Sequence, residues 1–102
     1  MKQVVVIIKP HVAEKVLTAL SELPLAGPGT IREVKGYGRQ KNYLSEYRGS
    51  EYSNAFLPKV WISFQIEDEH LNVATSKIVE VARSGRMGDG KIFVFSGDGM
   101  VF

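Results

Sequence analysis

A glycine-rich segment, residues 84–91, carries the residue types that bind small anions. It reads Ser-Gly-Arg-Met-Gly-Asp-Gly-Lys, so its glycines are interleaved with charged side chains. Glycine lets successive backbone N–H groups converge on one anion, and Arg86 or Lys91 could supply the positive charge that a phosphate attracts. The chain has neither the GxxxxGK[ST] pattern of a Walker loop nor a GxGxxG turn before a helix. The segment therefore indicates either an anion site of another kind or a plain turn between a helix and a strand.

A second segment, residues 36–41, combines glycine with a cation and an amide. It reads Gly-Tyr-Gly-Arg-Gln-Lys and stands before a long loop, while Lys59 stands after that loop. Gln40 and Lys59 are therefore expected to lie close together at the base of the loop. An amide beside an ammonium group suits a small carboxylate. The alternative interpretation is a loop hinge without a ligand.

The loop itself, at about residues 38–57, has no helical or strand period. It is polar and aromatic, with tyrosines at positions 43, 47 and 52. A loop of this length in a chain of 102 residues is usually functional or disordered rather than a simple connection. Exposed loop tyrosines are either partner contacts or modification sites. We expect Pro58 to mark the end of the loop.

Hydrophobic patterning predicts four strands around these segments. The continuous apolar run 4–8 indicates a strand that is buried on both faces. Apolar and polar residues alternate over 60–66, which indicates a strand with one buried face. Residues 30–37 and 92–95 are predicted as the other two strands. Trp61 would lie on the nominally outer face of its strand.

Apolar residues at helical spacing predict one helix over 12–23, ended by Pro24, and a second over 71–82. Asp68 is expected to cap the second helix at its N-terminus, and Gly85 to terminate it. The resulting order, β-α-β-loop-β-α-β, predicts an α+β, ferredoxin-like sandwich with both helices on one face of an antiparallel sheet. The other face of such a sheet is open, and a dimer or trimer would cover it.

Composition narrows the class of protein. The chain of 102 residues is sufficient for one domain, which we place over 1–102. It contains no cysteine, which excludes a disulfide scaffold and a thiolate metal site. A net charge of +2 does not argue for nucleic acid as a partner. No apolar run is long enough for a signal peptide or a membrane span, so we expect a cytoplasmic protein.

The motifs together carry a resemblance that spans nearly the whole chain. The chain resembles the nitrogen-regulatory P-II signal-transducer family. The blocks that carry the resemblance are Ile-Ile-Lys-Pro at 7–10, Glu-Val-Lys-Gly-Tyr-Gly-Arg-Gln-Lys at 33–41, Tyr-Arg-Gly-Ser-Glu-Tyr at 47–52, Phe-Leu-Pro-Lys-Val at 56–60 and Gly-Asp-Gly-Lys-Ile-Phe-Val-Phe at 88–95. The resemblance implies a homotrimer of ferredoxin-like subunits, with ATP or ADP in the clefts between subunits. It also implies that the long loop, called the T-loop, contacts a target protein, a transporter or an enzyme.

The resemblance also implies roles for individual residues. A small anion, 2-oxoglutarate together with Mg-ATP, would lie at Gln40, Lys41 and Lys59. Tyr52 corresponds to the tyrosine that some members carry for uridylylation. The nucleotide-binding residues would be Ile8, Thr30, Gly36, Tyr37, Gly38, Arg39, Met87, Gly88, Asp89, Gly90 and Lys91.

Two departures from the family pattern change these expectations. Typical members follow the last strand with a basic Arg-x-Arg segment that reaches a neighbouring subunit's nucleotide, and residues 96–102 contain no such pattern. We therefore expect ADP or AMP to be favoured over ATP. Asn-Tyr-Leu at 42–44 replaces a more usual glycine-led stretch. The divergent, P-II-like members linked to inorganic-carbon uptake are thought to sense bicarbonate, so bicarbonate and 2-oxoglutarate both stay open as the second effector.

Two alternatives belong to other functional classes. An RNA-recognition module shares the element order, but of its outward positions here, Trp61, Ser63 and Gln65, only one is aromatic. A small nucleotide-hydrolysing enzyme would need a catalytic constellation. Neither His11 nor His70 has the context of a triad or a metalloprotease motif, and Asp89 is a lone carboxylate among glycines. We therefore predict a binding and regulatory protein rather than an enzyme.

Overall fold

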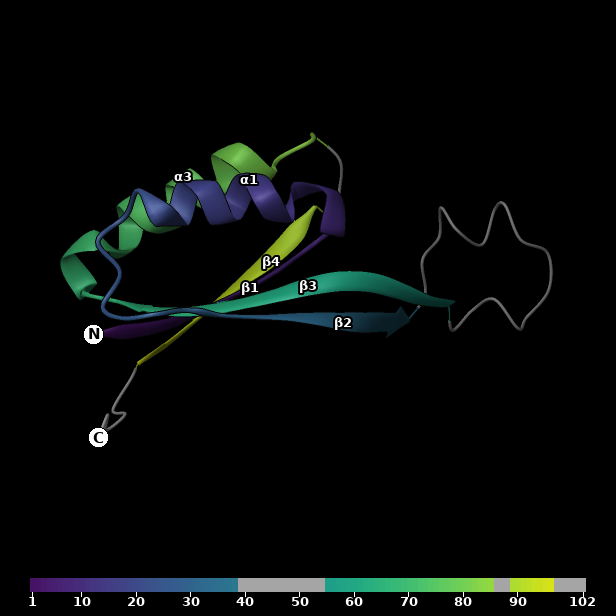
Figure 1. Cartoon of the computed structure of the whole chain (residues 1–102), viewed down its shortest axis with the longest axis horizontal. Coiled ribbons are helices and arrows are strands. Elements are labelled where there is room, and N and C mark those ends of the chain that lie inside the picture. Colours follow the sequence, from purple (N-terminus) through teal and green to yellow (C-terminus); the bar gives the residue numbers. More distant parts are fainter. Residues whose placement is uncertain (39–54, 86–88, 97–102) are drawn as a thin grey trace.

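The computed structural model describes residues 1–38, 55–85 and 89–96. Its elements follow the predicted order (Figure 1). They are β1 (Lys2–Ile8), α1 (Pro10–Ser21), β2 (Thr30–Gly38), β3 (Ala55–Ile66), the short 3-10 helix η2 (Asp68–His70), α3 (Leu71–Ala82) and β4 (Gly90–Ser96).

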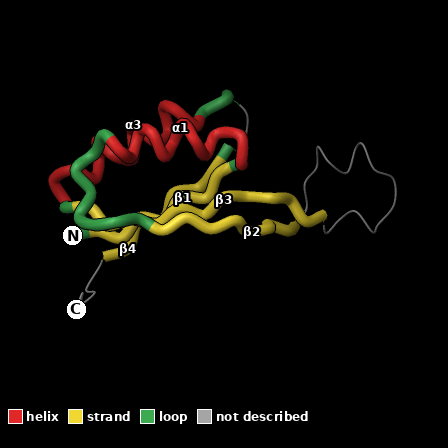
Figure 2. The backbone as a smooth tube through the Cα atoms, viewed as in Figure 1, coloured by secondary structure: helices red, strands yellow, loops and turns green. Residues whose placement is uncertain are grey.

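The strands form one antiparallel sheet in the order β2-β3-β1-β4. Both helices lie on the same side of this sheet and run alongside each other (Figures 1 and 2). The central position of β1 and β3 follows from their composition, since they carry the longest apolar patterns in the chain. The structure confirms the predicted α+β, ferredoxin-like fold.

The core lies between the sheet and the helices. Alternation along β3 is confirmed, because Ile62, Phe64 and Ile66 are each 2% exposed or less. The helices complete this core with the buried apolar residues Val12, Val16 and Leu20 of α1 and Ala74 and Ile78 of α3. A side chain that alternates onto the helix-facing side of the sheet is therefore buried within a single chain.

The opposite face of the sheet is apolar and partly exposed. Phe93 and Phe95 of β4 are 44% and 53% exposed, and their rings stack with centroids 6.5 Å apart. Trp61 lies on this face, and the Arg32 guanidinium covers it at 4.7 Å from the ring centroid. We expected β1 to be buried on both faces. Within one chain only its helix-facing side is fully buried, because nothing in the described residues covers the other face.

β2 and β3 extend beyond the rest of the sheet as a two-stranded ribbon. Their pairing continues from Val34–Lys59 to Gly38–Ala55, whereas β1 ends at the pair Ile8–Val60. Pro58 was expected to end the loop, but it lies inside β3 opposite Lys35. Its missing N–H is tolerated because β1 does not pair with this part of β3. The ribbon therefore includes Gly38 and residues 55–57, which the sequence analysis assigned to the loop.

Element ends also differ from the predictions. α1 ends at Ser21, before the expected Leu23, and its C-cap is Glu22. Asp68 does not cap α3. It lies in η2 and pairs with the N-terminal ammonium at 2.9 Å. Gly85 has the expected positive φ of 85°, but α3 has already ended at Ala82, so this glycine forms the turn after the helix rather than its cap.

Candidate anion-binding site

A pocket of about 280 Å³ lies where the C-terminal end of α3 meets β1 and β4. Its floor is apolar and includes Ile8 and Ile78, while Arg83, Asp89 and Lys91 lie around it. The structure thus brings together four of the residues predicted for the nucleotide: Ile8, Asp89, Gly90 and Lys91. An apolar floor with a charged rim suits a ligand that has a flat apolar part and an anionic part.

Gly90 is required by a close approach of two strands. It pairs with Ile8 at the start of β4. A Cβ atom at this position would lie 2.9 Å from the Ile7 carbonyl oxygen and 3.0 Å from Ile8 Cγ2. The sequence analysis explained the glycines of this segment by backbone access to an anion. The structure adds a steric reason that applies with no ligand bound.

Asp89 closes the turn that follows α3. The Ser84 amide donates a hydrogen bond to Asp89 Oδ2 at 2.7 Å, and the Ser84 hydroxyl donates to Oδ1. These bonds hold the pKa of Asp89 below its ordinary value. The role of Ser84 was missed, because a serine five positions before an aspartate is not a recognisable motif. In the part of the chain that the structure describes, no group of three or more side chains could hold a metal ion.

Three lysines converge at the same end of the sheet. Ile8 pairs with Val60 on β3 and with Gly90 on β4. In the next row, Lys9 therefore has Lys59 on one side and Asp89 on the other. Lys91 lies two positions further along the chain than Asp89, in the row of Ile7 and Trp61. Burial, together with the positive charges of Lys9 and Lys91, holds the pKa of Lys59 below its ordinary value. Like charges side by side on neighbouring strands are unfavourable, so this cluster favours an anion between them.

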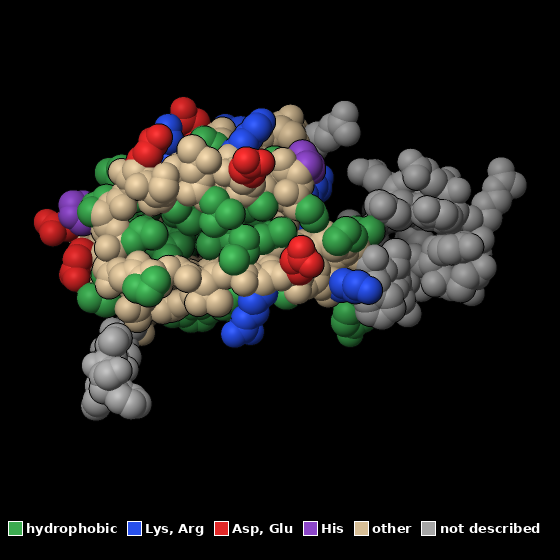
Figure 3. Space-filling view, in the orientation of Figure 1, with side chains coloured by type: hydrophobic (Ala, Val, Ile, Leu, Met, Phe, Trp, Pro, Cys, Tyr) green, Lys and Arg blue, Asp and Glu red, His purple; other side chains and the backbone are tan. Residues whose placement is uncertain are grey.

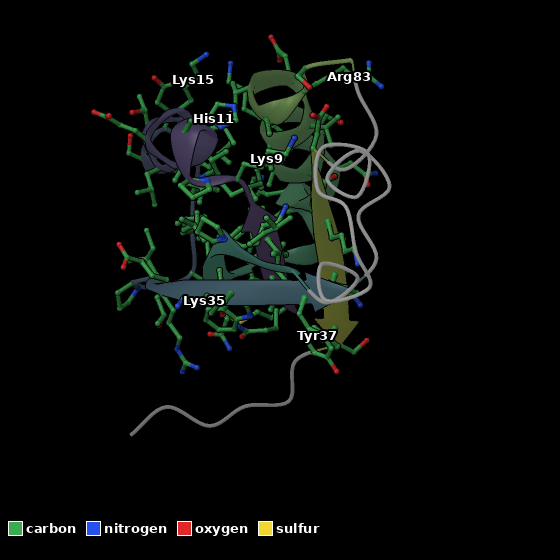
Figure 4. All side chains as sticks on the ribbon, turned by 90° about the vertical axis from the view of Figure 1, so that its right-hand side faces the viewer. Lys9, His11, Lys15, Lys35, Tyr37 and Arg83 are labelled. Carbon is green, nitrogen blue, oxygen red and sulfur yellow. The ribbon has the colours of Figure 1, made fainter. Side chains whose placement is uncertain are left out.

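Not all the predicted residues meet in one chain. Thr30 starts β2 and pairs with Ser63, whereas Gly36 and Tyr37 lie near the other end of that strand. At about 3.3 Å per residue the two ends are roughly 20 Å apart. In Figure 4, Tyr37 is also well separated from Lys9 and Arg83. Thr30 lines a different pocket, of about 240 Å³, which is mostly apolar.

That second pocket lies along the open side between α1 and β2. Leu17 and Ile31 line it and are 39% and 50% exposed. In the space-filling view, hydrophobic side chains gather in a hollow band between the helix layer and the sheet (Figure 3). The two pockets therefore lie on opposite sides of one chain. The remaining predicted site residues, Arg39, Gln40, Lys41, Tyr52, Met87 and Gly88, lie outside the described residues.

Two glycines that lie in strands, Gly90 of β4 and Gly36 of β2, give a first prediction about stability. Replacing Gly90 with alanine should lower the free energy of unfolding by about 1–3 kcal/mol, because the new methyl group has no room between the strands. Gly36→Ala is the matched control. Of the atoms in the described residues, its Cβ would meet only Lys59 Cγ, at 3.7 Å, and the change should leave stability within about 0.5 kcal/mol of the parent. Urea titrations of both variants test this. Equal stability of the two would show that β4 adjusts freely around residue 90.

Comparisons with known proteins define the class. The family model for nitrogen regulatory protein P-II matches residues 1–99, so the chain belongs to this family of signal-transduction regulators. It is 45% identical to "Nitrogen regulatory protein P-II 1" of Escherichia coli K12 over 95 residues, which cover 93% of this chain and 84% of that protein. It is 50% identical to "Nitrogen regulatory protein GlnK" of the same organism over 94 residues, which cover 92% and 83%.

Family membership confirms the resemblance found in the sequence. It also agrees with the prediction of a regulatory protein rather than an enzyme, because the family acts through partner proteins. None of the helices in the described ranges has both the length and the apolar character needed to cross a membrane.

Proposed function

We propose that this chain is a sensor that binds an adenine nucleotide together with a small anion and reports both to a partner protein. The observation that carries the proposal is the convergence of Ile8, Asp89, Gly90 and Lys91 on one apolar pocket. The nucleotide would be ADP or AMP, or ATP accompanied by Mg²⁺. The partner would be a transporter or an enzyme, contacted through the connection between β2 and β3.

The chemistry of the pocket supports a nucleotide. A base needs apolar surface, which Ile8 and its neighbours provide. Phosphates need donors and positive charge, which the backbone after Asp89 and the Lys91 ammonium can supply. Asp89 is already engaged by Ser84, so its carboxylate holds the turn and is not directed at the phosphates.

The lysine cluster supports a second, smaller anion. Lys59 has no ion-pair partner within 4.0 Å among the described residues, and neither has Lys9 or Lys91. Bicarbonate or 2-oxoglutarate placed here would relieve the repulsion between these ammonium groups. Gln40 and Lys41 would add contacts to 2-oxoglutarate, whereas bicarbonate needs less room.

The separation of the two pockets supports a homotrimer. One side of the chain carries Lys91 and Gly90, and the other carries Thr30 beside an apolar pocket. A heterologous contact between copies would bring Thr30 of one copy to the phosphate side of the next, and such contacts close into rings. The same assembly would cover Trp61 and Phe93, which are otherwise left on an open sheet face.

The ribbon supplies a route from the ligands to the partner. Lys59 is part of β3, and β2 and β3 lead directly from this row to the connection over 39–54. An anion held between Lys59 and its neighbours would favour one position of the ribbon over another. A partner that contacts the connection would then respond to the bound ligands, which is a population shift in the ordinary sense.

Calorimetric titration tests the proposed function. ADP, AMP and ATP with Mg²⁺ are each titrated alone, with bicarbonate and with 2-oxoglutarate. Preference for ADP or AMP, strengthened by bicarbonate, would make the chain an inorganic-carbon and energy sensor. Tight ATP binding strengthened by 2-oxoglutarate would make it a nitrogen and carbon sensor. Absence of binding by all three nucleotides would overturn the proposal.

A further inference from the structure

The amine of Lys59 lies close enough to Lys9 and Lys91 to be affected by both positive charges. Lys9, which follows β1 directly, falls in the same row as Lys59, and Lys91 on β4 is two positions away from that row, opposite Ile7. On β2, the residue opposite Lys59 is the uncharged Val34, and Arg32 is engaged over Trp61. Asp89 is the acidic group near this cluster, and Ser84 already donates to both of its oxygens. Within residues 1–38, 55–85 and 89–96, Lys59 therefore has cations near it and no carboxylate paired with it.

Such surroundings change the chemistry of a lysine. An ammonium group that is partly desolvated and placed beside other cations loses its proton more readily, and the free amine is a nucleophile. Both causes act on Lys59, since its side chain is half-buried and the positive charges of Lys9 and Lys91 act on its ammonium group. The same two cations would stabilise a negative charge on a group that becomes attached to Lys59 Nζ.

We propose that Lys59 is a reactive lysine that takes up CO2 as a carbamate. The lone pair on the uncharged Nζ attacks the carbon of CO2, and a nitrogen–carbon bond forms. One C=O electron pair moves onto oxygen, and a proton leaves the nitrogen for water. The balance is R–NH2 + CO2 → R–NH–COO⁻ + H⁺, with no oxidation or reduction.

The product suits the site better than the free amine does. Before the reaction, the positive charges of Lys9 and Lys91 repel the ammonium group of Lys59. Afterwards a carbamate lies beside Lys9 and can accept a charge-assisted hydrogen bond from it, while the positive charge of Lys91 also attracts it. The modification uses the small-anion site of the proposed function. It needs no nucleotide, so the two can fail independently.

Chemical trapping tests the inference on the full chain. The protein is equilibrated with ¹³C-labelled bicarbonate and dissolved CO2 over neutral to mildly alkaline pH, and carbamates are ethylated with a trialkyloxonium salt. Mass spectrometry of the digest should find the labelled ethyl carbamate on Lys59, with cleavage after this residue blocked. The adduct should be lost in Lys59→Arg, which keeps the charge but removes the nucleophile.

Lys35→Arg is the matched control, because Lys35 is an exposed lysine on the neighbouring strand. The adduct on Lys59 should survive this change. Lys9→Gln should move the onset of carbamate formation to higher pH, an effect that a purely structural lysine would not show. If Lys59→Arg does not fold, peptide mapping of the unmodified chain still locates the adduct.

The trapping and binding experiments together distinguish the Lys59 carbamate from the proposed nucleotide-binding function. An adduct on Lys59 without nucleotide binding would sustain the carbamate and sink the nucleotide sensor. Equal labelling of Lys59 and Lys35, or bicarbonate that binds but leaves no trapped adduct, would overturn the carbamate and leave nucleotide binding untouched.

Discussion

Replacing Phe64 with alanine should lower the free energy of unfolding by about 3–5 kcal/mol. Phe64 is 2% exposed and is among the largest fully buried side chains of the described core. It faces the helices from β3, a central strand that pairs with both β1 and β2. Because the core cluster that holds it is built from β1, β3 and both helices, these elements cannot all close around the lost ring. Urea unfolding followed by circular dichroism measures the loss.

Phe93→Ala is the control, with the same change of side chain on the opposite face of the sheet. Phe93 is 44% exposed within one chain. Its replacement should cost the folded chain much less than the loss at residue 64, but it should weaken a trimer that covers this face. Sedimentation analysis of the variant separates the two effects. A Phe93 variant that unfolds as readily as Phe64→Ala and stays fully assembled would contradict the assignment of the two faces.

Replacing Lys91 with glutamine should weaken ADP binding by about 10- to 150-fold, the equivalent of losing one charge-assisted hydrogen bond worth about 1.5–3 kcal/mol. Lys91 lies at the pocket and follows Gly90 in β4. Its side chain is exposed, so stability should be nearly unchanged. Calorimetry with ADP gives the affinity, and a thermal melt without ligand gives the stability.

Lys77→Gln provides the matched control, since it removes the same charge from α3 at a residue that does not line this pocket. ADP affinity should stay within about twofold of the parent, because Lys77 lines a separate groove between α1 and α3. If both variants lose affinity equally, Lys91 acts through overall charge and not through contact with a phosphate.

Much of the fold could be predicted because it depends on local patterns. The alternation of β3 and the apolar stripes of the helices are direct consequences of burial on one side. The ends of the elements were less predictable. Pro58 was expected to mark the end of the loop, but a proline is tolerated inside a strand where no other strand needs its N–H, and β1 stops before that row. Asp68 was read as a helix cap, and its carboxylate instead pairs with the N-terminal ammonium.

The part of the site that depends on local sequence patterns could also be predicted. Glycines next to Lys91 indicate an anion site from sequence alone, and the structure places one of them, Gly90, at a pocket. The meeting of Lys9 with Lys59 depends on strand register, which these residues do not encode locally. The bond between Ser84 and Asp89 depends on the turn after α3. Thr30 was grouped with Gly36 because the resemblance implies a nucleotide-binding role for both, yet one chain holds them near opposite ends of β2.

The most direct test of the nucleotide site is an amide NMR map of the isotopically labelled protein during titration with ADP. The account predicts saturable shifts at Asp89, Gly90 and Lys91, with further shifts at Gly36 and Thr30 if copies of the chain share the nucleotide. Residues on the outer surface of α1 should stay unmoved. Saturable shifts confined to the groove between Glu22 and Lys77, or no saturable shift at all, would contradict it.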